Sequence, residues 1–139
     1  MDQKTLVIQK ELSNDMEFSG DFLLKELTKK HIKIDAAMWF FYSEINDWKY
    51  ILVFDEFSQK GSSFVYETIS NINRTTLSKK YKRIPLNYIE VKSNTSFIYK
   101  SMKGLIHMES GRVRIANSMI NSFEINDCLI YIYIESYLI

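Results

Sequence analysis

The sequence is poor in the residues that build several common kinds of site. Among 139 residues there are one cysteine, one proline, four glycines and two histidines. A single cysteine excludes an internal disulfide, and so few glycines leave little room for a glycine-rich phosphate loop. The histidines and the cysteine show none of the spacings of a zinc site. We therefore expect neither a metal site nor a cofactor.

Long apolar runs are also missing from the start of the chain. Residues 1–10 hold only three consecutive apolar residues, too few for a signal peptide or a membrane-spanning helix. We therefore expect a cytoplasmic protein that does not contact a membrane. Cys128 fits a reducing compartment, and because it alternates with aliphatic residues we expect it to be a buried and inert thiol.

Aromatic residues, in contrast, are abundant. The chain has nine phenylalanines, nine tyrosines and two tryptophans, within a composition of 46% hydrophobic and 25% charged residues. Such a composition is typical of a globular protein, and this length suffices for one domain with its own core. We predict a single domain over residues 1–139.

Apolar periodicity predicts three helices. The first follows Ser13-Asn14-Asp15, where each residue is a good N-cap, and a second spans residues 64–77. The third follows the polar residues 93–95. The apolar side of the first helix has helical spacing and consists of Gly20, Leu23, Leu24 and Leu27. The third helix bears the apolar residues Phe97, Ile98, Met102 and Leu105.

About five strands complete the pattern. Residues 36–42 and 48–54 form a hairpin around a turn at 44–47, and further strands lie at 86–92, from 112 onward and at 128–139. Residues 36–42 are apolar on both faces, so this strand should be central and covered on both sides. The order of elements predicts an α+β fold: a two-layer sandwich of mostly antiparallel strands with three helices on one face.

The C-terminal strand has the most distinctive pattern. Residues 128–139 alternate strictly, which places isoleucines on one side of a strand and tyrosines on the other. If the aliphatic sides of the last three strands face the helices, their other sides form an open, tyrosine-rich and mildly basic face. Its predicted members are Tyr88, Glu90, Lys92, Arg112, Arg114, Tyr131, Tyr133, Glu135 and Tyr137.

Three stretches resemble a family of small uncharacterised bacterial proteins. They are residues 20–27, the hairpin that begins Ala36-Ala37-Met38-Trp39-Phe40, and the tail over residues 117–133. The family is similar in its Ala-Ala-x-Trp-Phe hairpin and its Asn…Ile-Asn…Ile-x-Asp-x-x-Ile-Tyr tail. Ser122 departs from this pattern, since the family tends to have glycine there. The resemblance implies a shared fold and supplies no activity and no catalytic residue.

The tyrosine face predicts binding. Tyrosine and arginine are enriched in protein interfaces because they offer a large, rigid contact area and a polar group. We expect a non-catalytic binding or accessory protein of a bacterial or phage system, which forms a homo-oligomer or binds a protein partner. The high strand propensity of tyrosine on a solvated sheet is an equally simple explanation of the pattern.

Two alternatives stay open. A nucleic-acid-binding protein would use Arg112 and Arg114 with aromatic stacking, together with a basic cluster at the end of the acid-free residues 74–83. This basic cluster consists of Lys79, Lys80, Lys82 and Arg83.

A metal-dependent nuclease would use Asp55 and Glu90 to hold Mg²⁺ and Lys92 to position water, although an ordinary solvated strand explains these residues more simply.

Overall fold

A five-stranded sheet forms the centre of the molecule in the computed structural model, which describes residues 8–55, 62–77, 81–104 and 106–134. The helices are α1 (Asn14–Lys29), α2 (Ser62–Ile72) and α4 (Phe97–Met102), with short helical segments η1 (Asn73–Leu77) and η2 (Leu86–Tyr88). The strands are β1 (Ile34–Tyr42), β2 (Asp47–Phe54), β3 (Ile89–Ser93), β4 (Val113–Ile120) and β5 (Phe123–Tyr133).

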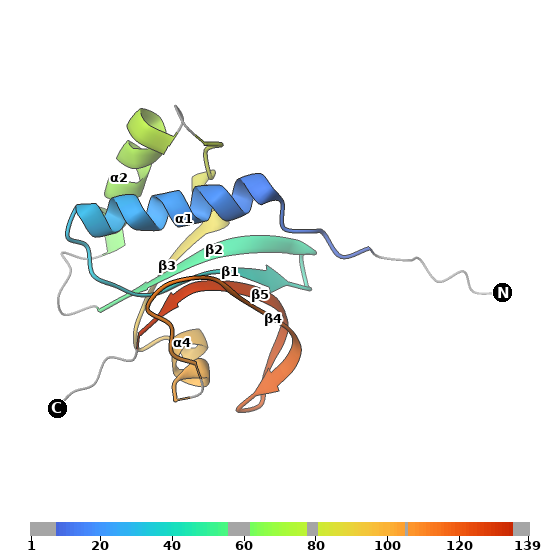
Figure 1. Cartoon of the computed structure of the whole chain (residues 1–139). Helices are drawn as coiled ribbons and strands as arrows, with labels where there is room; N and C mark the ends of the chain where they lie inside the picture. The colour runs from blue at the N-terminus through green and yellow to red at the C-terminus, as the bar shows by residue number, and fades with distance from the viewer. Residues whose placement is uncertain (1–7, 56–61, 78–80, 105, 135–139) are drawn as a thin grey trace.

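The sheet has the strand order β3-β2-β1-β5-β4. Only β2 and β3 pair in parallel, while the other neighbours are antiparallel. This confirms the predicted α+β class, the mostly antiparallel sheet and the order of the elements. One detail of the prediction is wrong: α1 and α2 cover one face, which we call the upper face, whereas α4 lies beneath the other, the lower face (Figure 1).

β1 is the middle strand, as its apolar pattern predicted. Ala37, Trp39 and Phe41 belong to the upper core, whereas Met38 and Phe40 belong to the lower one. All of these side chains are buried. A strand with two apolar faces therefore needs cover on both sides, and the helices supply it from above and from below.

Helix α1 begins and packs as its sequence indicates. The Ser13 hydroxyl caps the helix by accepting a hydrogen bond of 3.1 Å from the Met16 N–H. Leu23 and Leu27, one turn apart, are fully buried against the sheet. Burial of each leucine contributes roughly 1.5–3 kcal/mol, so this apolar side holds much of α1 in place.

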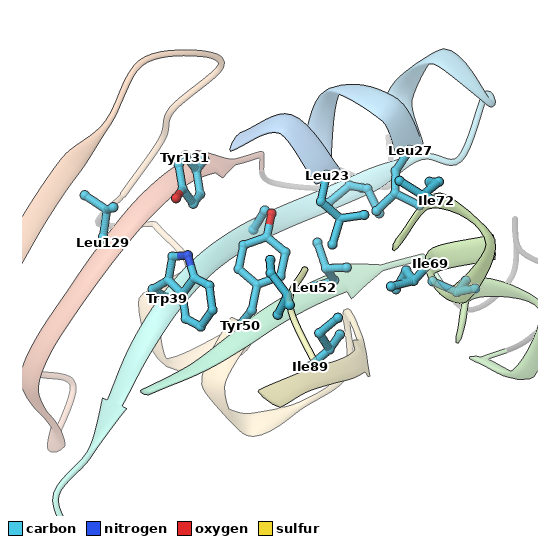
Figure 2. Close-up of a cluster of buried hydrophobic side chains, with 14 of the residues drawn as sticks. Leu23, Leu27, Trp39, Tyr50, Leu52, Ile69, Ile72, Ile89, Leu129 and Tyr131 are labelled. Atoms are coloured by element: carbon cyan, nitrogen blue, oxygen red, sulfur yellow. The ribbon is translucent and has the colours of Figure 1, made fainter. Parts of the chain in front are cut away.

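Helix α1 is also held on the sheet by polar contacts, which lie around Gly20. Three aromatic side chains from three strands lie under the helix and donate hydrogen bonds to its backbone carbonyls (Figure 2). Trp39 Nε1 donates to Met16 O at 3.1 Å, the Tyr50 hydroxyl to Gly20 O at 2.6 Å, and the Tyr131 hydroxyl to Glu17 O at 2.5 Å. The rings also contact one another, with centroids 5.1 Å apart for Trp39–Tyr50 and 6.2 Å for Tyr50–Tyr131.

A side chain at Gly20 would collide with this group. A Cβ atom there would lie 2.6 Å from Trp39 Nε1, 2.8 Å from the Tyr131 hydroxyl and 3.0 Å from Tyr50 Cε1. The close approach of helix to sheet therefore requires glycine at this position.

β5 contains a bulge that the sequence pattern does not reveal. Ala36 and Ala37 pair with Tyr133 and Ile132, but the next residue of β1, Met38, pairs with Ile130, so that Tyr131 is an extra residue. A bulge interrupts the alternation of faces. As a result Tyr131 belongs to the upper core and Tyr133 to the lower one.

Beneath the sheet, α4 is held by tyrosines and by the β4–β5 hairpin. The rings of Tyr99 and Tyr133 stack with centroids 4.9 Å apart, and the Tyr133 hydroxyl donates to Tyr99 O. The hairpin curls under the sheet towards α4 (Figure 1), and Asn121 Nδ2 donates to Ser101 O at 3.0 Å. These contacts close the lower core around a helix of six residues.

A tight turn at Asn121 and Ser122 joins β4 to β5. Both residues have positive φ, 49° and 64°, as the preferred two-residue hairpin turn requires. Glycine adopts this conformation most readily at the second position. Ser122, at this second position, is therefore strained.

We predict that Gly20→Ala destabilises the protein by about 1–3 kcal/mol, even though alanine is the better helix former, because the new methyl group overpacks three aromatic rings. Urea unfolding measures the change. Lys25→Ala, at an exposed position of the same helix, serves as the control and should stay within about 0.5 kcal/mol of the wild type. An equal effect of the two substitutions would contradict this account of α1 docking.

We predict that Ser122→Gly raises the free energy of unfolding by about 0.5–1 kcal/mol, because glycine relieves the positive φ. The control is Ser118→Gly inside β4. Glycine loses more conformational entropy than serine when it is ordered in a strand, so this substitution should lower the free energy of unfolding by a similar amount. Thermal unfolding of both variants provides the measurement. A lower melting temperature for Ser122→Gly would refute the strained-turn interpretation.

Candidate docking site on the lower face

The predicted open tyrosine face is not formed by the described residues. Tyr131 is 2% exposed and points up to α1, while Tyr133 is fully buried on the lower face. The bulge in β5 separates them, and burial raises the pKa of the Tyr131 hydroxyl, which stays a donor to α1. Tyr137 lies outside the described residues.

Of the two arginines of the predicted face, Arg112 does lie near Tyr131, but as part of the packing. Arg112 is placed over the rings of Phe18 and Tyr131, at 5.4 and 5.7 Å from their centroids. Its guanidinium donates to Glu17 Oε1 at 2.8 Å and to Asp21 Oδ2 at 3.2 Å. Although burial opposes it, these carboxylates raise the pKa of Arg112. Arg112 therefore joins the segment just before β4 to α1.

Arg114 covers the same face closer to the β1–β2 turn. It makes a two-pronged ion pair with Asp127, at 2.5 and 2.7 Å, and stacks over Trp48 at 5.2 Å from the ring centroid. Gln9 and the Cys128 N–H also donate to Asp127. The arginines therefore cover the upper face of β4 and β5.

The remaining predicted binding residues are scattered. Tyr88 is half-buried at the β3 edge, with the ammonium groups of Lys10 and Lys49 5.6 and 5.7 Å from its ring centroid. Lys82 and Arg83 are exposed near the start of α1, where Lys82 lies 3.6 Å from Asp15. Lys79 and Lys80 fall outside the described residues.

The predicted nuclease trio is not assembled. Glu90 stands opposite Ile51 in the parallel β2–β3 pair. Asp55 lies four residues beyond Ile51 along the chain, which at the rise of a strand places it about 13 Å from the level of Glu90. Glu90 pairs instead with Lys92 at 3.5 Å. Within the described residues, no group of three or more histidine, cysteine or acidic side chains could hold a metal ion.

Cys128 is buried, as predicted from its alternation with aliphatic residues. Burial, followed by the nearby carboxylate of Asp127, raises the pKa of its thiol. The thiolate, which is the reactive form of cysteine, is therefore disfavoured.

A large groove of about 780 Å³ lies on the upper face, between the outer side of α1 and the loop before β4. The charged side chains that α1 contributes are paired with one another: Lys25 with Asp21 at 3.0 Å, and Lys29 with Glu26 at 3.2 Å. Arg112, which also lines it, binds both Glu17 and Asp21. Such a lining favours a solvated surface over a site for a charged ligand.

A second concavity, of about 310 Å³, lies on the lower face near the β1–β2 turn, and we call it the phenylalanine hollow. Its aromatic lining comes from β1, β5 and the start of α4. Ring centroids lie 5.1 Å apart for Phe40–Tyr42, 5.7 Å for Phe40–Phe123 and 5.6 Å for Phe97–Phe123. The members of the hollow used below are Phe40, Tyr42, Glu44, Lys92, Ser96, Phe97, Phe123 and Glu124.

Phe97 distinguishes this hollow from the rest of the surface. Its side chain is 71% exposed although it packs edge-on against Phe123 at the wall of the concavity. Isolated exposed apolar residues are common, but an exposed ring at a concave aromatic surface is typical of an interaction site. The hollow can therefore receive a large apolar group.

Polar groups line the rim of the hollow. Burial and the carboxylate of Glu90 raise the pKa of the Tyr42 hydroxyl, which stays protonated at neutral pH. The Ser96 hydroxyl is buried at the start of α4 and has no hydrogen-bond partner in the part of the chain that the structure describes. Glu44 and Glu124 are both exposed.

Sequence reasoning missed this hollow, although one signal was present. Ile98 and Met102 are four residues apart and mark the buried side of α4. Phe97 lies about 100° around the helix from Ile98, outside that narrow apolar stripe. A phenylalanine beside the stripe of so short a helix therefore indicated an aromatic ring on the surface.

Comparisons with known protein families, with curated proteins and with solved structures find no match for this chain. The resemblance of the hairpin and tail to a bacterial family therefore stays a prediction. No helix among the described segments is long and apolar enough to cross a membrane.

We predict that Arg114→Ala destabilises the protein by about 1–3 kcal/mol, because Asp127, a nearly buried carboxylate, loses its two-pronged partner. Adding Asp127→Asn to Arg114→Ala should recover part of the lost stability, because it removes the uncompensated charge. Urea unfolding of the single and double variants gives the coupling. The control is Arg83→Ala, at an exposed position, and equal effects of the two arginine substitutions would exclude a structural role for the pair.

Proposed function

We propose that the protein is a non-catalytic binding protein that takes up an apolar side chain of a protein partner in the phenylalanine hollow. The observation that carries the proposal is the 71% exposure of Phe97 at the wall of an aromatic concavity. Interface hot spots are enriched in aromatic residues that fill well-packed pockets. A volume of about 310 Å³ is at the small end of ligand pockets and suits one or two side chains.

The charge of the hollow favours a protein over a nucleic acid. Glu44 and Glu124 stand exposed at its rim, and Lys92 is paired with Glu90. Binding of nucleic acid depends on the neutralisation of phosphates by basic side chains, and acidic groups would repel them. The described basic residues Lys82 and Arg83 do not line this hollow.

Selection of peptides from a phage-displayed random library on the immobilised protein tests the proposal. We predict that selected peptides contain a large apolar residue and bind Phe97→Ala at least about tenfold more weakly, a loss of about 1.4 kcal/mol. The matched control is Phe64→Ala, which removes an exposed ring at the start of α2. Because Phe97 is so exposed, its substitution should change the free energy of unfolding by about 1 kcal/mol or less.

The outcomes separate the possible occupants. Peptides whose affinity is unchanged by Phe97→Ala would contradict the proposal, since their site would lie elsewhere. Light scattering after size exclusion identifies self-association if the wild type is a dimer and Phe97→Ala is a monomer. A salt-sensitive complex with a single-stranded oligonucleotide that survives Phe97→Ala would favour nucleic-acid binding instead.

A further inference from the structure

The charged groups of the phenylalanine hollow are not balanced. Glu44 follows β1 and Glu124 lies in β5, and both are exposed. The third charged group, Lys92 in β3, has its ammonium 3.5 Å from Glu90 Oε2, a carboxylate outside the hollow. With Lys92 occupied in this way, the aromatic concavity has an acidic rim.

We infer that the partner segment carries a lysine or arginine next to the large apolar residue that enters the hollow. This inference rests on the proposed function and names the chemistry of the partner. Complementary charges around an apolar contact fix the register of binding and disfavour wrong partners. Two acidic groups at the rim attract a basic flank and repel an acidic one.

The size of the effect follows from the exposure of the two carboxylates. An ion pair at an exposed site changes a binding constant by up to about fivefold. A basic flank that meets both Glu44 and Glu124, compared with an acidic flank repelled by both, should therefore differ by about tenfold or more. The difference should shrink as salt is added, because exposed charges are screened.

Three fluorescein-labelled peptides test the inference by fluorescence anisotropy: Lys-Lys-Leu-Phe-Lys-Lys, Ser-Ser-Leu-Phe-Ser-Ser and Glu-Glu-Leu-Phe-Glu-Glu. We predict that the wild type binds them in this order of decreasing affinity, with at least about tenfold between the first and the last. The variant Glu44→Lys/Glu124→Lys should invert the order. The control Glu67→Lys/Glu109→Lys makes the same change of net charge on α2 and in the loop before β4, and should keep the wild-type order.

Each contrary result has its own meaning. If the neutral peptide binds as tightly as the basic one and loses affinity on Phe97→Ala, the basic flank is wrong while the proposed function stands. If the control variant also inverts the order, net charge and not the rim governs binding, and the inference fails. Binding that Phe97→Ala leaves unchanged, or no binding of any peptide at about 1 mM, overturns the inference as well.

Discussion

The docking of α1 on the sheet depends on a position that has no side chain. At Gly20 the helix backbone comes within hydrogen-bond distance of the polar tips of aromatic rings from β1, β2 and β5. Three strands are thereby tied to one turn of one helix. The same placement aims Glu17 and Asp21 at Arg112, so the ion pairs that join α1 to the segment just before β4 depend on it too. A single close approach thus fixes the relation of α1 to both halves of the sheet.

Much of this fold could be predicted from the sequence because its signals are local. The cap at Ser13 and the spacing of Leu23 and Leu27 define α1, and the two-sided apolar pattern of β1 defines the centre of the sheet. Each depends on a short window of residues, within which periodicity is informative. The element order followed from the same windows and was confirmed.

The bulge in β5 could not be predicted in this way. Residues around Tyr131 and Tyr133 alternate without interruption in the sequence, and the extra residue becomes evident only from the pairing with β1. One inserted residue exchanges the faces of the side chains beyond it. The prediction of a tyrosine face was therefore wrong, because the faces of Tyr131 and Tyr133 depend on how β5 pairs with β1.

To predict the phenylalanine hollow, one would need contacts between residues even further apart in the sequence, since the hollow joins β1, β5 and the start of α4. Its residues share no sequence window. The prediction that α4 shares the face of α1 and α2 was wrong, because a helix can cross from β3 to β4 above or below the sheet. The position of α4 is set by Tyr99, whose ring stacks on Tyr133 and whose carbonyl accepts a hydrogen bond from the Tyr133 hydroxyl. The bulge places Tyr133 on the lower face.

The two faces of the sheet are covered in different ways, and the difference explains where the hollow lies. Above, α1 has 16 residues and the arginines extend its cover over β5. Below, α4 has six residues and is about 9 Å long, whereas five strands span about 19 Å. The curled hairpin covers part of the remainder (Figure 1). The concavity near the β1–β2 turn is the part of the lower face left beside it. A polar residue at position 97 would suit such an exposed position if only folding mattered, and the proposed partner would account for the aromatic ring there.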